Sequence, residues 1–153
     1  MGEQKRGRRI AMSPDEVDAF LAGERTCRVA TTGPSGPHAT PLWFVWHGGA
    51  LWLHSLSRSQ RWADLQRDPR LAAVVDAGQD YLELRGVELA GEAEVVGEVP
   101  RTGEDHPDLG PVEAAFAEKY LGGAEMAYDG RHGWLRVRPT TVRSWDFRKL
   151  ADG

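Results

Sequence analysis

The feature that most constrains this chain is a run of three apolar, β-rich segments separated by very short connections. The segments cover residues 26–32, 38–46 and 50–55, and glycine and proline are prominent in the connections. Such short connections join antiparallel strands, because parallel strands need a crossover of roughly a dozen residues or more. The sequence therefore predicts an antiparallel β-meander and disfavours a Rossmann-type fold.

A short helix is expected directly after the meander, over about residues 59–66. Ser59 is a favoured N-cap residue, and Asp68-Pro69 would end the helix. Arg58 and Arg61 lie at its amino-terminal end, where the helix dipole disfavours cations. A bound phosphate would resolve this conflict, because the free N–H groups of a helix start attract anions. The alternative is that both arginines are simply solvated.

Further elements flank the meander. A capping box at Ser13–Glu16 begins a helix that Gly23 ends. After the second helix, a fourth strand is expected over 71–76, followed by a long β segment over 81–99. The alternation of this segment changes phase at Arg85-Gly86, which predicts a bulge or a sharp bend there.

The last third of the chain is expected to contain a loop, a helix and a strand. Pro111 would open the helix, and the strand would cover residues 132–143. Asp105, His106 and Asp108 of the loop could bind a metal on paper. No second pair of ligands at a suitable spacing supports them, so no metal site is predicted.

Composition limits the classes of function. The chain has 153 residues, one cysteine (Cys27) and a net charge of −4. These values predict one domain, a cytoplasmic protein without disulfides, and no nucleic-acid partner. No apolar run is long enough to span a membrane, and no signal region precedes the first helix. Residues 1–12 are expected to be a flexible basic tail ahead of a domain over residues 13–153, unless Arg8 and Arg9 fold over an anionic cofactor.

The second strand of the meander is apolar on both faces. Pro41, Trp43 and Val45 share one face, and the other carries Leu42 and its neighbours Phe44 and Trp46. A strand of this kind is covered on both sides, which in a short chain suggests a second subunit and hence a homodimer. Pro41 cannot donate a backbone hydrogen bond, so the sheet is expected to be interrupted there, leaving backbone groups free for a ligand.

The same stretch resembles the pyridoxamine-phosphate-oxidase-like family of flavin- and deazaflavin-binding split barrels. The matching segments are Arg28–Thr32, Gly36–His38 leading into Pro41–Phe44, and Ser59–Arg61 followed by Asp68–Arg70. This resemblance implies a mainly β (α+β) fold. The expected architecture is an antiparallel split β-barrel of six or seven strands, with two or three flanking helices, that forms a homodimer.

The resemblance also implies a cofactor site. In this family a Ser-Arg-Lys-like triplet holds the flavin phosphate, and here it reads Ser59, Gln60 and Arg61. Thr40, Pro41, Leu42 and Trp43 would run along the flavin ring. His54 and Ser55 would contact the ring or its ribityl oxygens. Trp145 and Arg148, from the partner chain, would close the pocket. No catalytic residue of the protein is predicted.

The function that follows is an oxidoreductase. It would transfer a hydride between coenzyme F420, or FMN, bound at the dimer interface and a small conjugated organic substrate. F420 is favoured because Pro41–Phe44 looks more like the deazaflavin branch, although Arg61 and Asp64 stand where that branch usually has Lys and Asn. Three alternatives stay open. They are a flavin- or haem-binding protein without turnover, in which His54 would bind the iron, an interaction module without a cofactor, and, less favoured, pyridoxamine 5'-phosphate oxidase itself.

Overall fold

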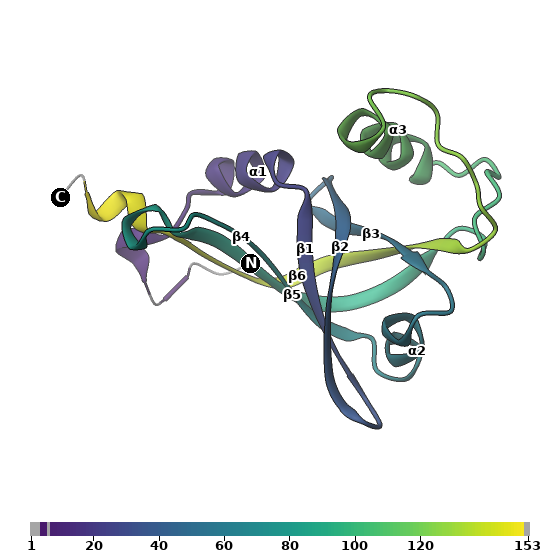
Figure 1. Cartoon of the computed structure of the whole chain (residues 1–153), viewed down its shortest axis with the longest axis horizontal. Coiled ribbons are helices and arrows are strands. Elements are labelled where there is room, and N and C mark those ends of the chain that lie inside the picture. The colour runs from purple at the N-terminus through teal and green to yellow at the C-terminus, as the bar shows by residue number, and fades with distance from the viewer. Residues whose placement is uncertain (1–3, 6, 152–153) are drawn as a thin grey trace.

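The computed structural model describes residues 4–5 and 7–151, and its centre is a six-stranded antiparallel barrel (Figure 1). The strands are β1 (Thr26–Gly33), β2 (Gly36–His47), β3 (Ala50–Leu56), β4 (Arg70–Ala77), β5 (Arg85–Val96) and β6 (His132–Asp146). The α-helices are α1 (Pro14–Gly23), α2 (Gln60–Arg67) and α3 (Leu109–Tyr120). Three short 3-10 helices cover Arg8–Ile10, Tyr81–Glu83 and Phe147–Leu150. The expected mainly β split barrel with two or three flanking helices is confirmed.

The barrel is split between β2 and β3. Its strand order is β1-β2-β3-β6-β5-β4, with every pair antiparallel. Yet β2 pairs with β3 only through Phe44–His47, whereas its first part pairs with β1 alone. The end of β3, beyond Leu53, pairs only with β6. The two strands therefore diverge and leave a cleft between them.

Apolar side chains lie on both sides of the sheet, in two clusters. The barrel interior holds residues such as Val29, Phe44 and Leu53, and α1 closes one end of it with Val17 and Leu21. The second cluster lies between α3 and the outer face of the sheet, and its buried members are Val45, Ala50, Trp52, Val96, Leu109, Val112, Phe116 and Trp134. Burial on both faces explains why the second part of β2 is apolar on both sides.

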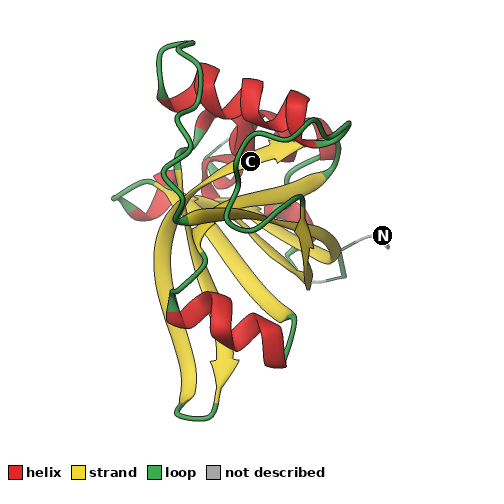
Figure 2. Cartoon of the chain, turned by 90° about the vertical axis from the view of Figure 1, so that its right-hand side faces the viewer, coloured by secondary structure: helices red, strands yellow, loops and turns green. Residues whose placement is uncertain are grey.

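The helix starts follow the capping signals of the sequence. The Ser13 hydroxyl accepts a hydrogen bond from the backbone N–H of Glu16, whose carboxylate accepts one from the N–H of Ser13. Ser59 caps α2 in the same way by accepting from the N–H of Trp62. Figure 2 shows α2 lying beside the protruding hairpin of β1 and β2. The described helices include none that is long and apolar enough to cross a membrane.

Two backbone irregularities lie elsewhere than the sequence predicted. The bulge expected at Arg85-Gly86 is absent, because the preceding residues form a 3-10 helix and β5 begins at Arg85. The register instead shifts between Ala90 and Gly91, opposite Pro139, which has no N–H to donate. Pro41, where an interruption of the sheet was expected, still pairs with Arg28 of β1. The break in pairing is on the β3 side of β2.

The described part of the basic amino-terminal segment lies against the end of β6 (Figure 1). The side-chain amide of Gln4 donates to the carbonyl of Ser144 at 3.1 Å and accepts from its N–H at 2.8 Å. The N–H of Met12 donates to the Ser144 hydroxyl at 2.9 Å. These contacts join the two ends of the chain. Residues 1–3 and Arg6 of the predicted tail, together with residues 152–153, lie outside the described residues.

Candidate functional site

The cleft between β2 and β3 is bridged by one arginine. Nη1 of Arg61, from α2, donates to the hydroxyl of Thr40 on β2 at 2.6 Å. Nη2 and Nε donate to the hydroxyl of Ser55 on β3 at 3.1 and 3.3 Å. Three residues that the family resemblance implied as cofactor ligands therefore meet in one cluster, where the strands diverge.

The guanidinium of Arg61 is buried without a carboxylate partner among the described residues. Arg61 is only 8% exposed, and its hydrogen bonds go to the two hydroxyls. Burial lowers the pKa of Arg61 below its ordinary value, although an arginine remains charged. Two residues before Thr40 on the same face of β2, Nδ1 of His38 is also buried without a partner. A buried cation held by hydroxyls alone is a suitable site for an anion.

The position of Arg61 is fixed by the contacts that hold α2 on the hairpin. Asp64 is buried, accepts from the hydroxyl of Thr31 at 2.9 Å, and accepts from the side-chain amide of Gln60 at 2.8 Å. These hydrogen bonds, that from Gln60 first, lower the pKa of Asp64. A Cβ atom at Gly33 would collide with the Asp64 carboxylate, so a larger residue there would have to displace this side chain from its hydrogen bonds. Asp64 therefore holds the helix while Arg61 enters the cleft.

An aromatic pocket of about 530 Å³ lies on the outer side of the cleft. Its lining is mostly apolar and consists of Trp43, His54, Phe116, Leu121, Ala124, Glu125, Met126, Ala127 and His132. The Trp43 ring stacks on Tyr120 at a centroid distance of 4.3 Å and an angle of 10°. This volume and this lining are typical of a site for a small organic molecule.

Two imidazoles provide polar groups in this pocket. His54 and His132 stack at a centroid distance of 4.4 Å and an angle of 13°. Burial, and second the neighbouring His132 ring, lower the pKa of His54 to about 4, so its ring is neutral near pH 7. Nδ1 of His132 lies 2.7 Å from the carboxylate of Asp129, and this interaction contributes to lowering the pKa of Asp129 to about 2.

A second, cationic pocket of about 490 Å³ adjoins the start of α2. Its lining is Leu56, Ser57, Arg58, Ser59, Gly130 and Arg131. Arg131 precedes His132 of the aromatic pocket, so β6 begins between the two pockets. The described residues contain no group of histidine, cysteine, aspartate and glutamate side chains that could hold a metal ion.

The structure divides the predicted site residues into those near the cleft and those far from it. Thr40, Trp43, His54, Ser55 and Arg61 line the cleft or the aromatic pocket. The remaining predicted residues near the cleft have other contacts: Leu42 packs against the barrel core, Pro41 is exposed, Ser59 caps α2 and Gln60 holds Asp64.

Trp145 lies at the end of β6 opposite His132, and Arg148 lies in the 3-10 helix that follows this end. The Trp145 ring packs over Gly86 of β5, and Arg148 forms an ion pair with Asp146 at 2.8 Å. One chain therefore does not bring these two residues to the cleft.

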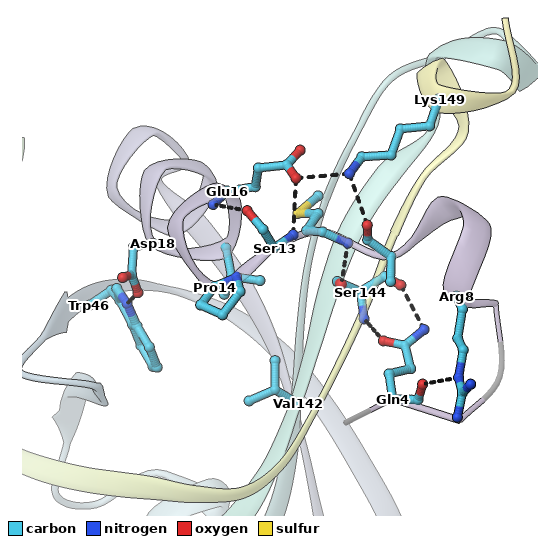
Figure 3. A pocket seen from close by; sticks show the side chains of 13 residues that line it. Gln4, Arg8, Ser13, Pro14, Glu16, Asp18, Trp46, Val142, Ser144 and Lys149 are labelled. Atoms are coloured by element: carbon cyan, nitrogen blue, oxygen red, sulfur yellow. Dashed lines mark hydrogen bonds and ion pairs between the residues drawn. The ribbon is translucent and has the colours of Figure 1, made fainter. Parts of the chain in front are cut away.

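A larger pocket, of about 750 Å³, is also at that far end (Figure 3). It lies between the amino-terminal segment, α1 and β6. The ion pair of Glu16 and Lys149, at 2.8 Å, lies on one side, and Trp46, which donates to Asp18 at 2.8 Å, lies on the other. Its charged groups include an ion pair, whereas the guanidinium of Arg61 has no carboxylate partner among the described residues.

Sequence reasoning missed four residues of the site: Phe116, Asp129, Arg131 and His132. They lie far from the meander in the sequence. Asp129, Arg131 and His132 reach the cleft because β6 pairs with β3, with His132 opposite Leu56, and Phe116 reaches it because α3 packs on the outer face of the sheet. The available signal was the cluster of Asp129, Arg131 and His132 directly before a strand, a position where functional side chains often lie.

Comparison with known proteins identifies relatives of this chain. The pyridoxamine 5'-phosphate oxidase family matches residues 13–146. A conserved hypothetical protein of Mycobacterium tuberculosis has 32% sequence identity and a TM-score of 0.81, with 98% of this chain and 93% of that chain covered. No curated protein matches the sequence.

Two more distant structures share the fold. An F420 reductase has 23% identity and a TM-score of 0.58, covering 82% of this chain and 94% of its own. The haem storage protein HutZ of Vibrio cholerae has 14% identity and a TM-score of 0.64. The match covers 84% of this chain and 92% of HutZ. At these identities the similarity is one of fold alone.

Proposed function

This chain belongs to the pyridoxamine 5'-phosphate oxidase-like family of flavin- and F420-binding split barrels, and from this membership we propose that it binds a phosphate-bearing flavin or deazaflavin in the cleft between β2 and β3. The protein would act as an oxidoreductase on a small conjugated organic substrate. The observation that carries this proposal is the buried guanidinium of Arg61, which has two hydroxyl partners and no carboxylate among the described residues.

The residues present fit the phosphate of such a cofactor. Arg61 offers a planar set of donors suited to phosphate oxygens, and Thr40 and Ser55 already lie within hydrogen-bonding distance of it. A phosphate would provide the negative charge that this buried cation lacks. Arg58 and Arg131 in the neighbouring pocket would add favourable charge at the outer side.

The aromatic pocket, on the outer side of the cleft, fits the planar ring of the organic substrate beside the bound cofactor. Trp43, Phe116 and His54 present ring surfaces that can stack on it and exclude water. A bound flavin or deazaflavin would supply hydride transfer, and the protein would bind and orient the reactants. We favour F420 over FMN, because the sequence of β2 resembles the deazaflavin branch.

A homodimer is part of this proposal. Trp145 and Arg148 would reach the cleft only from a second chain, since they lie at the far end of β6 in their own. A row of small residues crosses five neighbouring strands on the outer face of the barrel. It consists of Ala39, Ala30, Ala72, Ala90 and Thr141. These residues are exposed or half-exposed, and such a flat row suits close packing against a second copy.

The experiment is a titration of the purified protein with FMN and with F420, followed by tryptophan fluorescence. Wild-type protein is expected to bind one of them, and Arg61→Met is expected to weaken binding roughly 10- to 150-fold, the value of a hydrogen bond to a charged group. Arg67→Met, an exposed arginine at the end of the same helix, is the matched control. Equal affinities of the two variants, or no binding by wild type, would contradict the proposal.

A haem-binding function is the second candidate, favoured by the neutral imidazole of His54 in an aromatic pocket. It predicts a Soret band after haem addition that His54→Ala or His132→Ala removes and Arg61→Met leaves intact. The proposed flavin function predicts instead that Arg61→Met weakens binding of the cofactor.

A further inference from the structure

The walls of the aromatic pocket suit a flat ring. Trp43 is 45% exposed, yet its stacking on Tyr120 fixes its orientation. Phe116 lies at 6.2 Å from Trp43 and 5.3 Å from His54, measured between ring centroids. Flat ring surfaces in these positions favour a planar ligand, which loses little of its own freedom on binding.

The polar end of this pocket has a defined hydrogen-bonding character. Because the Asp129 carboxylate can only accept, Nδ1 of His132 must carry the proton of their 2.7 Å interaction. In the neutral imidazole the other nitrogen, Nε2, is then an acceptor. Nε2 has no hydrogen-bond partner among the described residues, and His132 lines the pocket. The one carboxylate of the lining is that of Glu125.

We propose that this pocket binds a flat aromatic molecule carrying a hydroxyl or N–H group, and that Nε2 of His132, held in this form by Asp129, accepts the hydrogen bond from that group. The inference rests on the proposed function, because it describes the organic substrate that would lie beside the cofactor. His132 is a binding and positioning residue in this proposal. Asp129 acts through it, as a carboxylate that fixes the tautomer.

The test compares two probes that differ in one donor, 2-naphthol and 2-methoxynaphthalene. The calorimetric titration uses the cofactor-free protein at pH 8.5, about two units above the pKa of an ordinary imidazole, where 2-naphthol is still largely protonated. Wild-type protein is expected to bind 2-naphthol roughly 3- to 10-fold more tightly, the value of one net hydrogen bond. His132→Phe keeps an aromatic ring against His54. This variant is expected to bring the ratio of the two affinities, 2-naphthol over 2-methoxynaphthalene, to about one.

Three further variants make the test specific. Asp129→Ala is expected to reduce the ratio, because the tautomer is no longer fixed. Glu125→Gln should leave it unchanged, which excludes the other acceptor. Ala127→Trp fills the pocket at an exposed position and should abolish binding of both probes.

Some outcomes would overturn the inference. They are equal binding of the two probes to wild type, no binding of either, or a preference that survives in His132→Phe. If His132→Phe fails to fold, Asp129→Ala and Glu125→Gln still decide between the two acceptors. The probe titrations contain no cofactor. A protein that binds FMN or F420 but shows no preference for 2-naphthol would therefore contradict this inference and leave the proposed function standing.

Discussion

At the scale of single residues, His54 makes the stability of the protein depend on pH. Its pKa is about 4 in the folded state and near 6.5 in the unfolded chain. Between these values the unfolded chain binds more protons, so the free energy of unfolding should fall as the pH falls from about 6.5 to about 4. The loss attributable to this residue is at most about 3 kcal/mol.

Urea unfolding of wild type and His54→Phe at pH 7.5, 5.5 and 4.5 measures this contribution. Carboxylates such as Glu98 also lose stabilising contacts, but chiefly at lower pH and in both proteins. The difference between the two proteins should therefore change between pH 7.5 and 4.5. A constant difference would show that His54 is not titrating in this window.

The residues of the cleft differ in how far the sequence could reveal them. Thr40, Ser55 and Arg61 were implied by a family resemblance, and the structure brings them together. Ser59 and Gln60 were implied as phosphate ligands, and in the structure their side chains hold α2. A polar residue at a helix start can serve either role, and local sequence does not distinguish the two.

At the scale of elements, the packing of β6 on β5 depends on a glycine. A Cβ atom at Gly86 would lie 2.5 Å from the Trp145 ring and 2.9 Å from the carbonyl oxygen of Val75. Gly86→Ala should therefore destabilise the protein by about 1–3 kcal/mol, as an overpacked core does. Thermal unfolding measures the change.

The control is Gly110→Ala in the first turn of α3, where a Cβ atom meets nothing within 4 Å. This change should be neutral or stabilise the protein by up to about 1 kcal/mol, because alanine favours the helix. If both substitutions change the melting temperature alike, the Trp145 contact does not constrain Gly86.

Helices and strands were predictable from the sequence, whereas the sheet irregularity was not. Capping residues and apolar alternation act locally, so they placed α1, α2 and the meander near their observed bounds. The shift at Ala90 and Gly91 depends on Pro139 in the facing strand. Its cause is a pairing between distant segments, which alternation within one segment cannot reveal.

At the scale of the whole molecule, the proposed homodimer predicts a mass of twice the 16.9 kDa of one chain. Ala30 lies in the middle of the alanine row, paired with Ala39 on one side and Ala72 on the other. Ala30→Arg should shift the protein to one chain, because a large charge would be buried in the interface. Light scattering after size-exclusion chromatography measures the mass.

Ala114→Arg, on the exposed side of α3, is the matched control and should remain dimeric. A wild-type mass of 16.9 kDa would contradict the homodimer. If instead both variants stay dimeric, the interface lies on another face of the barrel.

The barrel was predictable from the sequence. Which residues far along the chain would join the site was not. Short turns indicated an antiparallel meander, and the family resemblance implied the split barrel. The sequence could not show that the end of β3 leaves β2 for β6, which brings Asp129 and His132 beside His54. This arrangement depends on how strands far apart in the chain divide their pairings.

The split between β2 and β3 also leaves an open sheet edge that could attract foreign strands. A two-residue turn joins Gly33 and Gly36, so these two residues form a hydrogen-bonded pair. From there, hydrogen-bonded and non-hydrogen-bonded pairs alternate along the hairpin. Pro37 and Pro41 then occupy positions whose N–H groups would point out of the free edge. Because proline has no N–H, two of the donors that could recruit another strand are missing. The same opening that admits a ligand is thereby protected against aggregation.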